Sequence, residues 1–403
     1  MSDATTTAPP SGRIVSLDQF RGYTVAGMFV VNFLGSFEAC PRILRHTNDY
    51  CSYADTIMPQ FLFAVGFAFR LTFERRVQRE GAAAAYARVI RRLLGLAALA
   101  LMVYVLVPMA LSWPRVLEKP GTEVLASVLK RDWFQTLLQI AVTSLWILPV
   151  IRTPAAARIA FAAASVALHV ALSAWFNFEW VNTPPNGIDG GPLGFLTWTI
   201  PAIVGSLACD MVAAGANASP VQTMLATGLA LMLTGWVMSC GTRLYDVGSL
   251  DRQTEHRPDS KLSAWPVVPP REAWAGRAWT TMLAEPPFVP PPPSNARRWN
   301  YWMMSQRGGT LSYLTLAAGF SMAVFALFYV TCDRWGWRSG VLQTFGVNAL
   351  AGYVLHDPIG RMVSSFVPRD SQAWWMWVAC GVYLAICWLS LRVMEKGGIF
   401  MRL

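Results

Sequence analysis

The sequence predicts an all-α integral membrane protein, a bundle of about ten transmembrane helices with one long outer loop. Of its 403 residues 54% are apolar and only 14% are charged, whereas soluble domains carry roughly 25% charged residues. Ten apolar runs approach or reach the roughly 17–25 residues that a helix needs to cross a bilayer. One connection between two of these runs is dense in arginine, as cytoplasmic loops of membrane proteins are.

The predicted spans follow one another along almost the whole chain. They cover residues 22–39, 52–71, 93–113, 135–151, 157–177, 194–214, 220–240, 310–332, 340–356 and 373–393. Residues 1–12 are polar and lack the basic start and cleavage pattern of a signal peptide, so we predict a disordered cytoplasmic tail. Residues 13–403 then form one transmembrane domain, into which the long loop 241–309 is inserted.

The arginine cluster predicts the orientation of the chain. Its members are Arg70, Arg75, Arg76, Arg79, Arg88, Arg91 and Arg92. The positive-inside rule makes this connection cytoplasmic, so both termini lie inside and the loop containing His46 lies outside. The loop 114–134, with four basic residues, disagrees with this alternation, and the larger cluster outweighs it. The net charge of +10 is therefore a topological signal, and no nucleic-acid partner is predicted.

The loop 241–309 is rich in proline and tryptophan. Its proline tract favours extended polyproline geometry, and tryptophan is enriched at membrane interfaces. A loop that lies on the bilayer surface or covers the helix bundle is the simpler interpretation. The functional interpretation is that the loop forms a lid, or a surface on which sugars stack, over an outer site.

Cysteine spacing predicts no metal site, because no C-x-x-C pair occurs among the seven cysteines. Four of them lie in or near apolar runs and are interpreted as small buried hydrophobes. Cys40 and Cys51 bracket the loop containing His46. The sequence is compatible with a disulfide between them in an oxidising compartment and equally with two free thiols.

Polar residues in the first two spans are candidates for function. Asn32 and Asp55 stand at depths where a polar side chain is costly without a partner or water, and His46 lies between them with a side chain that titrates near neutral pH. Taken alone, His46 is an ordinary loop histidine, and Asn32 with Asp55 is equally compatible with hydrogen bonding between helices. In an active site, the carboxylate would orient the imidazole and the amide would donate to an oxyanion.

Asp18 and Arg21 lie three residues apart at the inner end of the first span, on one helix face. An interfacial salt bridge with a snorkelling arginine is the common arrangement. The alternative is a contact to a phosphate group that enters from the cytoplasm, since the planar guanidinium suits phosphate recognition.

The order of several motifs resembles one enzyme family. These are D-x-F-R-G at Asp18–Gly22, F-V-V-N ending at Asn32, the loop His46, and A-D-x-x-x-P-x-F-x-F-x-x-G at 54–66. Further pieces are Gln139 in LLQIAV, PLGFLTWTIPAIVG at 192–205, and FGVNALAGYVLH at 345–356. Together they resemble heparan-alpha-glucosaminide N-acetyltransferase and its bacterial relatives, which lack the outer N-terminal domain of the animal enzyme.

The resemblance implies an acyl-CoA-dependent transmembrane acyltransferase in the bacterial inner membrane. Acetyl-CoA would be the cytoplasmic co-substrate, and the acceptor an amino group or hydroxyl of an outer sugar or glycan. His46 would be the base or a transient acyl carrier, with Asp55 orienting it and Asn32 holding the thioester carbonyl. Arg21, Asp18 and Asn348 would contact CoA, and His356 would lie on the substrate side. A homo-oligomer is left open.

Two hypotheses from other classes remain beside this one. A transporter of a small anionic or lipid-linked substrate would use the same intramembrane polar groups. A membrane scaffold would leave Asn32, Asp55 and Asn348 as packing contacts that satisfy one another. A cavity that is open to the cytoplasm and approaches His46 would favour acyl transfer.

Overall fold

The computed structural model describes residues 14–104, 113–114, 121–214, 219–247, 262–275, 278–291 and 296–401. Within these ranges the chain is helical, and the only β-type pairs are two isolated bridges. The all-α prediction therefore holds for the described chain. The predicted tail 1–12 lies outside the described residues.

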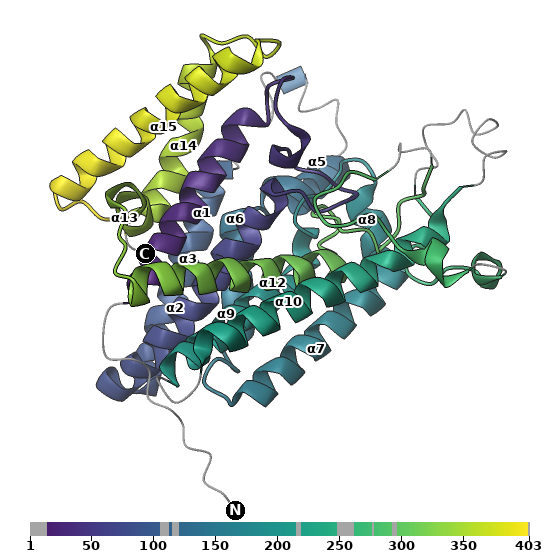
Figure 1. Ribbon diagram of the computed structural model, residues 1–403, viewed down its shortest axis with the longest axis horizontal. Helices are drawn as coiled ribbons and strands as arrows, with labels where there is room; N and C mark the ends of the chain where they lie inside the picture. The colour runs from purple at the N-terminus through teal and green to yellow at the C-terminus, as the bar shows by residue number, and fades with distance from the viewer. Residues whose placement is uncertain are drawn as a thin grey trace, which may run out of the picture.

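Thirteen α-helices of the described chain are used below. Their bounds are α1 Val15–Leu34, α2 Ile57–Glu80, α3 Ala82–Tyr104, α5 Gly121–Ser127, α6 Thr136–Ile147, α7 Ala155–Leu172, α8 Phe178–Asn182, α9 Phe195–Ala213, α10 Pro220–Ser239, α12 Leu311–Phe328, α13 Gly340–Val347, α14 Ala349–Ser364 and α15 Ala373–Lys396. Figure 1 shows α10 and α12 packed side by side, and α14 and α15 together at the opposite edge of the bundle.

Six helical segments of the described chain are long and apolar enough to cross a membrane. They are Ala54–Glu80, Ala155–Asn182, Gly191–Ala213, Pro220–Tyr245, Leu311–Arg334 and Ala373–Lys396. This confirms an integral membrane protein and does not confirm about ten spans. The predicted run 135–151 forms only the short helix α6, and the run 340–356 breaks at Asn348 into α13 and α14. The end of the run 93–113 lies outside the described residues.

Two predicted boundaries differ in the structure. The first span was expected over 22–39, but α1 begins at Val15 and ends at Leu34. Its first two turns therefore contain the charged Asp18 and Arg21. The connection 114–134 also contains helix α5 and a π-helical turn, Val128–Asp132, where a simple loop was expected.

Helices α2 and α9 form the centre of the bundle. The apolar window of α9 is 72% buried, whereas those of α7 and α10 are each 22% buried and so present most of their surface to the surroundings. Gly66 and Gly205 allow the close approach of α2 and α9. A Cβ at Gly66 would lie 1.8 Å from the carbonyl oxygen of Ala202, and one at Gly205 would lie 2.0 Å from that of Phe63. Small residues commonly form such contacts between membrane helices.

The two cysteines that bracket the His46 loop are both buried free thiols. Cys40 follows α1, and Cys51 precedes α2. The sequence was compatible with a disulfide between them or with two free thiols, and the structure contains two free thiols.

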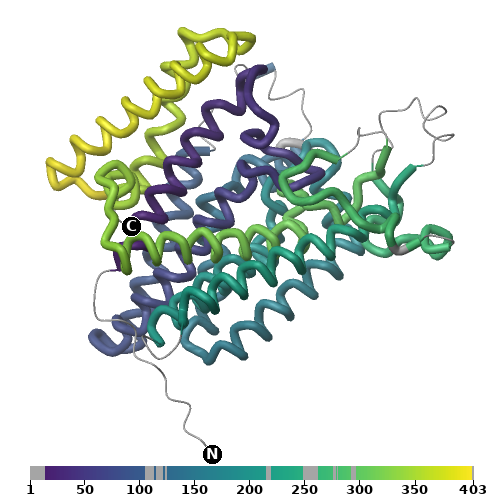
Figure 2. The backbone as a smooth tube through the Cα atoms, in the orientation of Figure 1, coloured from purple at the N-terminus to yellow at the C-terminus, as the bar shows by residue number. Residues whose placement is uncertain are grey.

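The described parts of the long loop fold back over the His46 loop. The backbone N–H of Phe288 donates to the carbonyl oxygen of Cys51 at 3.1 Å. Arg297, which is 5% exposed, holds the ends of this segment together through Asp246 at 2.6 Å and Glu285 at 2.9 Å. The smooth trace in Figure 2 follows this segment away from the ends of α10 and α12 and back to the bundle.

Arg297 should therefore be a determinant of stability. We expect Arg297→Met to lower the free energy of unfolding by about 3 kcal/mol, the lower end of the range for removing one partner of a buried ion pair. Both carboxylates keep partial contact with water, which moderates the loss. Thermal melting in detergent measures it, with the exposed Arg271→Met as control. Equal melting temperatures for the two variants would contradict the prediction.

Candidate active site

The loop between α1 and α2 brings His46 against Asp55. Helix α1 ends at Leu34, and Asp55 occupies a 3-10 turn, Ala54–Thr56, directly before α2. The imidazole Nδ1 lies 3.0 Å from the carboxylate Oδ1. Because a carboxylate oxygen accepts, Nδ1 is the donor, and the other ring nitrogen is left for a reacting group.

Several donors from the same loop fix the carboxylate of Asp55. Oδ2 accepts hydrogen bonds from the Thr47 hydroxyl at 3.0 Å and from the Ser52 hydroxyl at 2.9 Å. The Ser52 N–H also donates to Oδ2 at 3.0 Å, and the carboxylate is 1% exposed. The structure thus places a buried, oriented acceptor behind the histidine. Sequence reasoning missed Thr47 and Ser52, since single hydroxyl residues in a loop carry little signal.

The His46 side chain is accessible to solvent, and the protein around it favours its charged form. Its side chain is 44% exposed. Desolvation by the surrounding protein would lower its pKa, but the hydrogen bond and charge of Asp55 outweigh this effect. Asp189 and Gln306 add to the effect of Asp55, and the pKa of His46 is raised above 6.5.

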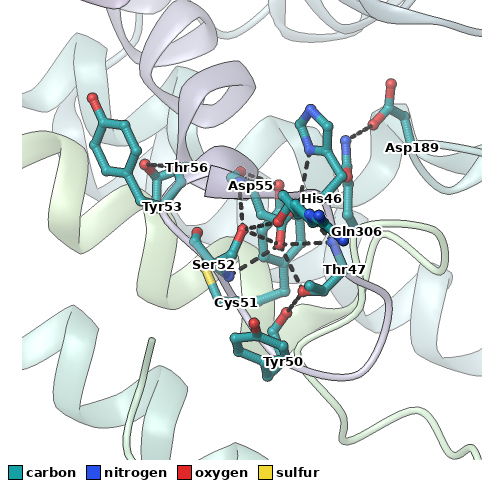
Figure 3. A network of polar contacts seen from close by, with 12 residues as sticks. His46, Thr47, Tyr50, Cys51, Ser52, Tyr53, Asp55, Thr56, Asp189 and Gln306 are labelled. Atoms are coloured by element: carbon teal, nitrogen blue, oxygen red, sulfur yellow. Dashed lines mark hydrogen bonds and ion pairs between the residues drawn. The ribbon is translucent and has the colours of Figure 1, made fainter. Parts of the chain in front are cut away.

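Gln306 and Asp189 complete this network, and sequence analysis did not identify either of them. The Gln306 amide Nε2 donates to Asp189 Oδ1 at 3.1 Å, and Gln306 also helps to raise the pKa of His46. Figure 3 shows Gln306 between the imidazole and Asp189. The two residues come from segments more than 100 positions apart, so no local pattern could have joined them to His46.

Asn32 lies in a second polar group, with His356 as its partner. His356 Nδ1 contacts the carbonyl oxygen of Tyr353 at 2.5 Å, which makes Nδ1 the donor and Nε2 an acceptor. Asn32 Nδ2 donates to that Nε2 at 3.1 Å. An amide nitrogen carries two hydrogens, so one of them is not used by His356. Sequence analysis expected Asn32 beside His46, but among the described residues its side chain hydrogen-bonds to His356 instead.

A cavity of about 810 Å³ runs along the inside of α2. Its wall includes Phe61 near the start of that helix and Arg76 near its end. These positions are 15 residues apart, or about 22 Å at 1.5 Å per residue, which is most of a hydrocarbon core of roughly 30 Å. Tyr353, the neighbour of His356, lines the same cavity.

One end of the cavity is rich in arginine. Arg21, Arg76 and Arg92 line it, and Arg92 lies within electrostatic range of both others. Within the described chain no salt bridge is found for Arg76 or Arg92. Asp18 and Glu395 line the same end, so the predicted pair Asp18–Arg21 does face a cavity. Three guanidinium groups beside two carboxylates leave an excess of positive charge at this end, which suits a polyanion.

Asn348 stands at the break between α13 and α14. Its Nδ2 donates to the carbonyl oxygen of Ile399 at 3.1 Å, and its buried Oδ1 has no hydrogen-bond partner among the residues that the structure describes. Asn348 does not itself line the cavity, although its neighbours Val347 and Ala349 do. The structure thus gives it a role in holding the C-terminal segment beside the arginine-rich end.

Together these features define a polytopic helical membrane protein with an arginine-lined cavity and a histidine that is hydrogen-bonded to a buried carboxylate. Residues 13–188 match the family model described as "Heparan-alpha-glucosaminide N-acetyltransferase, catalytic". This match confirms the predicted resemblance to that family over a stretch that makes up less than half of the chain. No curated protein matches the chain.

Proposed function

We propose that the protein transfers an acetyl group from cytoplasmic acetyl-CoA to an amino group or hydroxyl of a sugar or glycan on the outer face. The observation that carries the proposal is the cavity. Its volume of about 810 Å³ lies within the roughly 300–1,000 Å³ of ligand sites. Its arginine-rich end suits the phosphates of CoA, and its other end reaches Phe61, six residues after Asp55.

The proposed chemistry needs a base at the outer end. The acceptor nitrogen or oxygen attacks the thioester carbonyl, and its proton passes to His46, whose positive charge Asp55 stabilises. The new C–N or C–O bond forms, the C–S bond breaks, and the imidazolium returns the proton to the departing CoA thiolate. Attack by the imidazole itself, giving an acetyl-histidine that the acceptor then resolves, uses the same residues.

Asn32 and His356 are proposed to act as a unit at the end of the cavity. Because His356 accepts one hydrogen of the Asn32 amide, the amide is oriented while its second hydrogen is available for the thioester oxygen. An oriented donor of this kind stabilises the oxyanion that develops during attack. Arg21 and Asp18 are proposed to contact CoA directly, and Asn348 to support that end.

We also propose the arrangement of the chain that this function needs. Residues 13–403 form one acyltransferase-like domain in the bacterial inner membrane, with both termini in the cytoplasm and the His46 loop outside. The loop 241–309 covers the outer site, which the hydrogen bond from Phe288 to Cys51 supports. CoA is too polar to cross lipid, so the cavity would carry the acetyl group to the acceptor.

The test is acetyl transfer by purified protein in proteoliposomes. Labelled acetyl-CoA is supplied on one side and glucosamine or a glycan on the other, and both CoA release and labelled product are measured. We expect product only when acetyl-CoA contacts the side bearing Arg70–Arg92. No CoA release with any acceptor in either orientation would overturn the proposal, and uptake of solute independent of CoA would point to a transporter.

A further inference from the structure

Asp189 is a buried carboxylate whose backbone is held in an unusual conformation. Its φ angle is 53°, a left-handed value that few residues other than glycine adopt. Its carbonyl oxygen accepts hydrogen bonds from Gln139 Nε2 at 3.2 Å and from Trp198 Nε1 at 2.8 Å. A Cβ at Gly194 would lie 2.0 Å from that oxygen. Side chains from α6 and α9 thus fix a backbone position that the local sequence does not favour.

The carboxylate determines which way the Gln306 amide faces. Asp189 Oδ1 is an acceptor, so the Gln306 nitrogen must turn toward it, as it does at 3.1 Å. The amide oxygen is then the atom of Gln306 left to act on His46, whose pKa Gln306 helps to raise. An amide oxygen beside an imidazole favours its protonated form. Figure 3 shows dashed lines from His46 to Asp55 and from Gln306 to Asp189.

Among the described residues, His46 is the group that can balance the charge of Asp189. Desolvation raises the pKa of Asp189 to about 7, opposed by the Gln306 hydrogen bond and by His46, while Asp55 adds repulsion. The neighbouring cations are engaged elsewhere, since Lys130 donates to Thr183 and Arg307 stacks over Trp299.

The remaining titratable groups in range are neutral phenols. The hydroxyls of Tyr104, Tyr313 and Tyr353 lie within electrostatic range of Asp189, and a phenol with its ordinary pKa near 10 supplies no positive charge at neutral pH. A protonated His46 and an ionised Asp189 therefore stabilise each other through Gln306.

We propose that Asp189 is a positioning residue for acyl transfer, which acts through Gln306 to favour the imidazolium that forms when His46 takes the acceptor's proton. The inference rests on the proposed function, because it assigns a role within that reaction. It adds a second carboxylate to the site, from a segment that immediately follows the part of the chain matched by the family model.

The test is the effect of Asp189→Asn on the titration of His46. Removing the negative charge lowers the His46 pKa, so the acidic limb of the rate profile moves to lower pH. We expect roughly half a unit to one unit, less than the one to three units of a direct charge contact. Gln306→Met should shift the limb in the same direction. Asp49→Asn is the matched control, since Asp49 is a loop carboxylate that is not among the partners of His46.

A second readout separates this inference from the proposed function. Nitrogen NMR of the four histidines follows the His46 titration whether or not the protein transfers acetyl groups. Wild-type protein without activity would remove the proposed function, while a lowered His46 pKa in Asp189→Asn and Gln306→Met would still support the coupling. An unchanged pKa in both variants, with activity lost equally at every pH, would show a merely structural role and overturn the inference.

Discussion

Replacing His46 by alanine is expected to lower acetyl transfer by about 10²–10⁴-fold, the usual contribution of a positioned general base. The imidazole is the accessible titratable group in the Asp55 network, and Asp55, at 3.0 Å, has no other histidine among its partners in the described chain. The rate at saturating acetyl-CoA should fall, because the cavity itself is unchanged. Steady-state measurement of kcat checks the prediction.

The controls for this variant come from the same loop. Asn48→Ala changes a neighbouring polar side chain and should keep activity within about twofold of wild type, as expected for a position outside the network. Asp55→Asn should lower kcat and move the acidic limb to lower pH, because it removes the main charge that raises the His46 pKa. Full activity of His46→Ala would refute the assignment of this residue.

The raised pKa of His46 gives opposite pH trends for activity and stability. The base must be neutral, so activity should rise with pH through a pKa above 6.5. The protonated form is the one that the folded protein binds better, because the folded pKa exceeds the unfolded value. Its contribution to stability is therefore complete below about pH 6.5 and is lost as pH rises through the folded pKa. Rate profiles and melting curves of the same preparation measure both trends.

The second large effect is expected at the arginine-rich end of the cavity. Arg92→Met should raise the KM for acetyl-CoA about 10-fold or more, since a charge-assisted contact contributes roughly 1.5–3 kcal/mol and 1.4 kcal/mol is a factor of ten. Arg76→Met should behave alike. Both side chains line the cavity, and neither has an ion-pair partner in the part of the chain that the structure describes.

A shortened donor isolates the phosphate contacts. Acetyl-pantetheine keeps the thioester and lacks the nucleotide, so its KM should be nearly the same in Arg92→Met and wild type. Arg91→Met is the matched control, because Arg91 is on the same helix and does not line the cavity. A KM for acetyl-CoA that is equal in wild type, Arg92→Met and Arg76→Met would show that the donor binds elsewhere.

Local patterns in the sequence were sufficient to predict many of the membrane helices and part of the candidate active site. Apolar runs predict membrane helices because hydrocarbon excludes unpaired backbone groups, and six of the expected spans are confirmed. The same patterns could not give the break at Asn348, since one residue between two short apolar helices leaves hydropathy unchanged. The pair His46 and Asp55 was accessible to sequence reasoning because only nine positions separate the two residues.

Tertiary structure alone decided the partners that come from distant segments. Asn32 was expected beside His46 and contacts His356, 324 positions away, because α14 packs against α1. Gln306 and Asp189 reach His46 from separate loops, and the three arginines converge from α1, α2 and α3. The composition of a segment and the spacing of residues close together in sequence predict which of its faces contact lipid and which contact water. Which polar groups share a buried space depends on helix packing, and that packing depends on contacts among residues that are far apart in the chain.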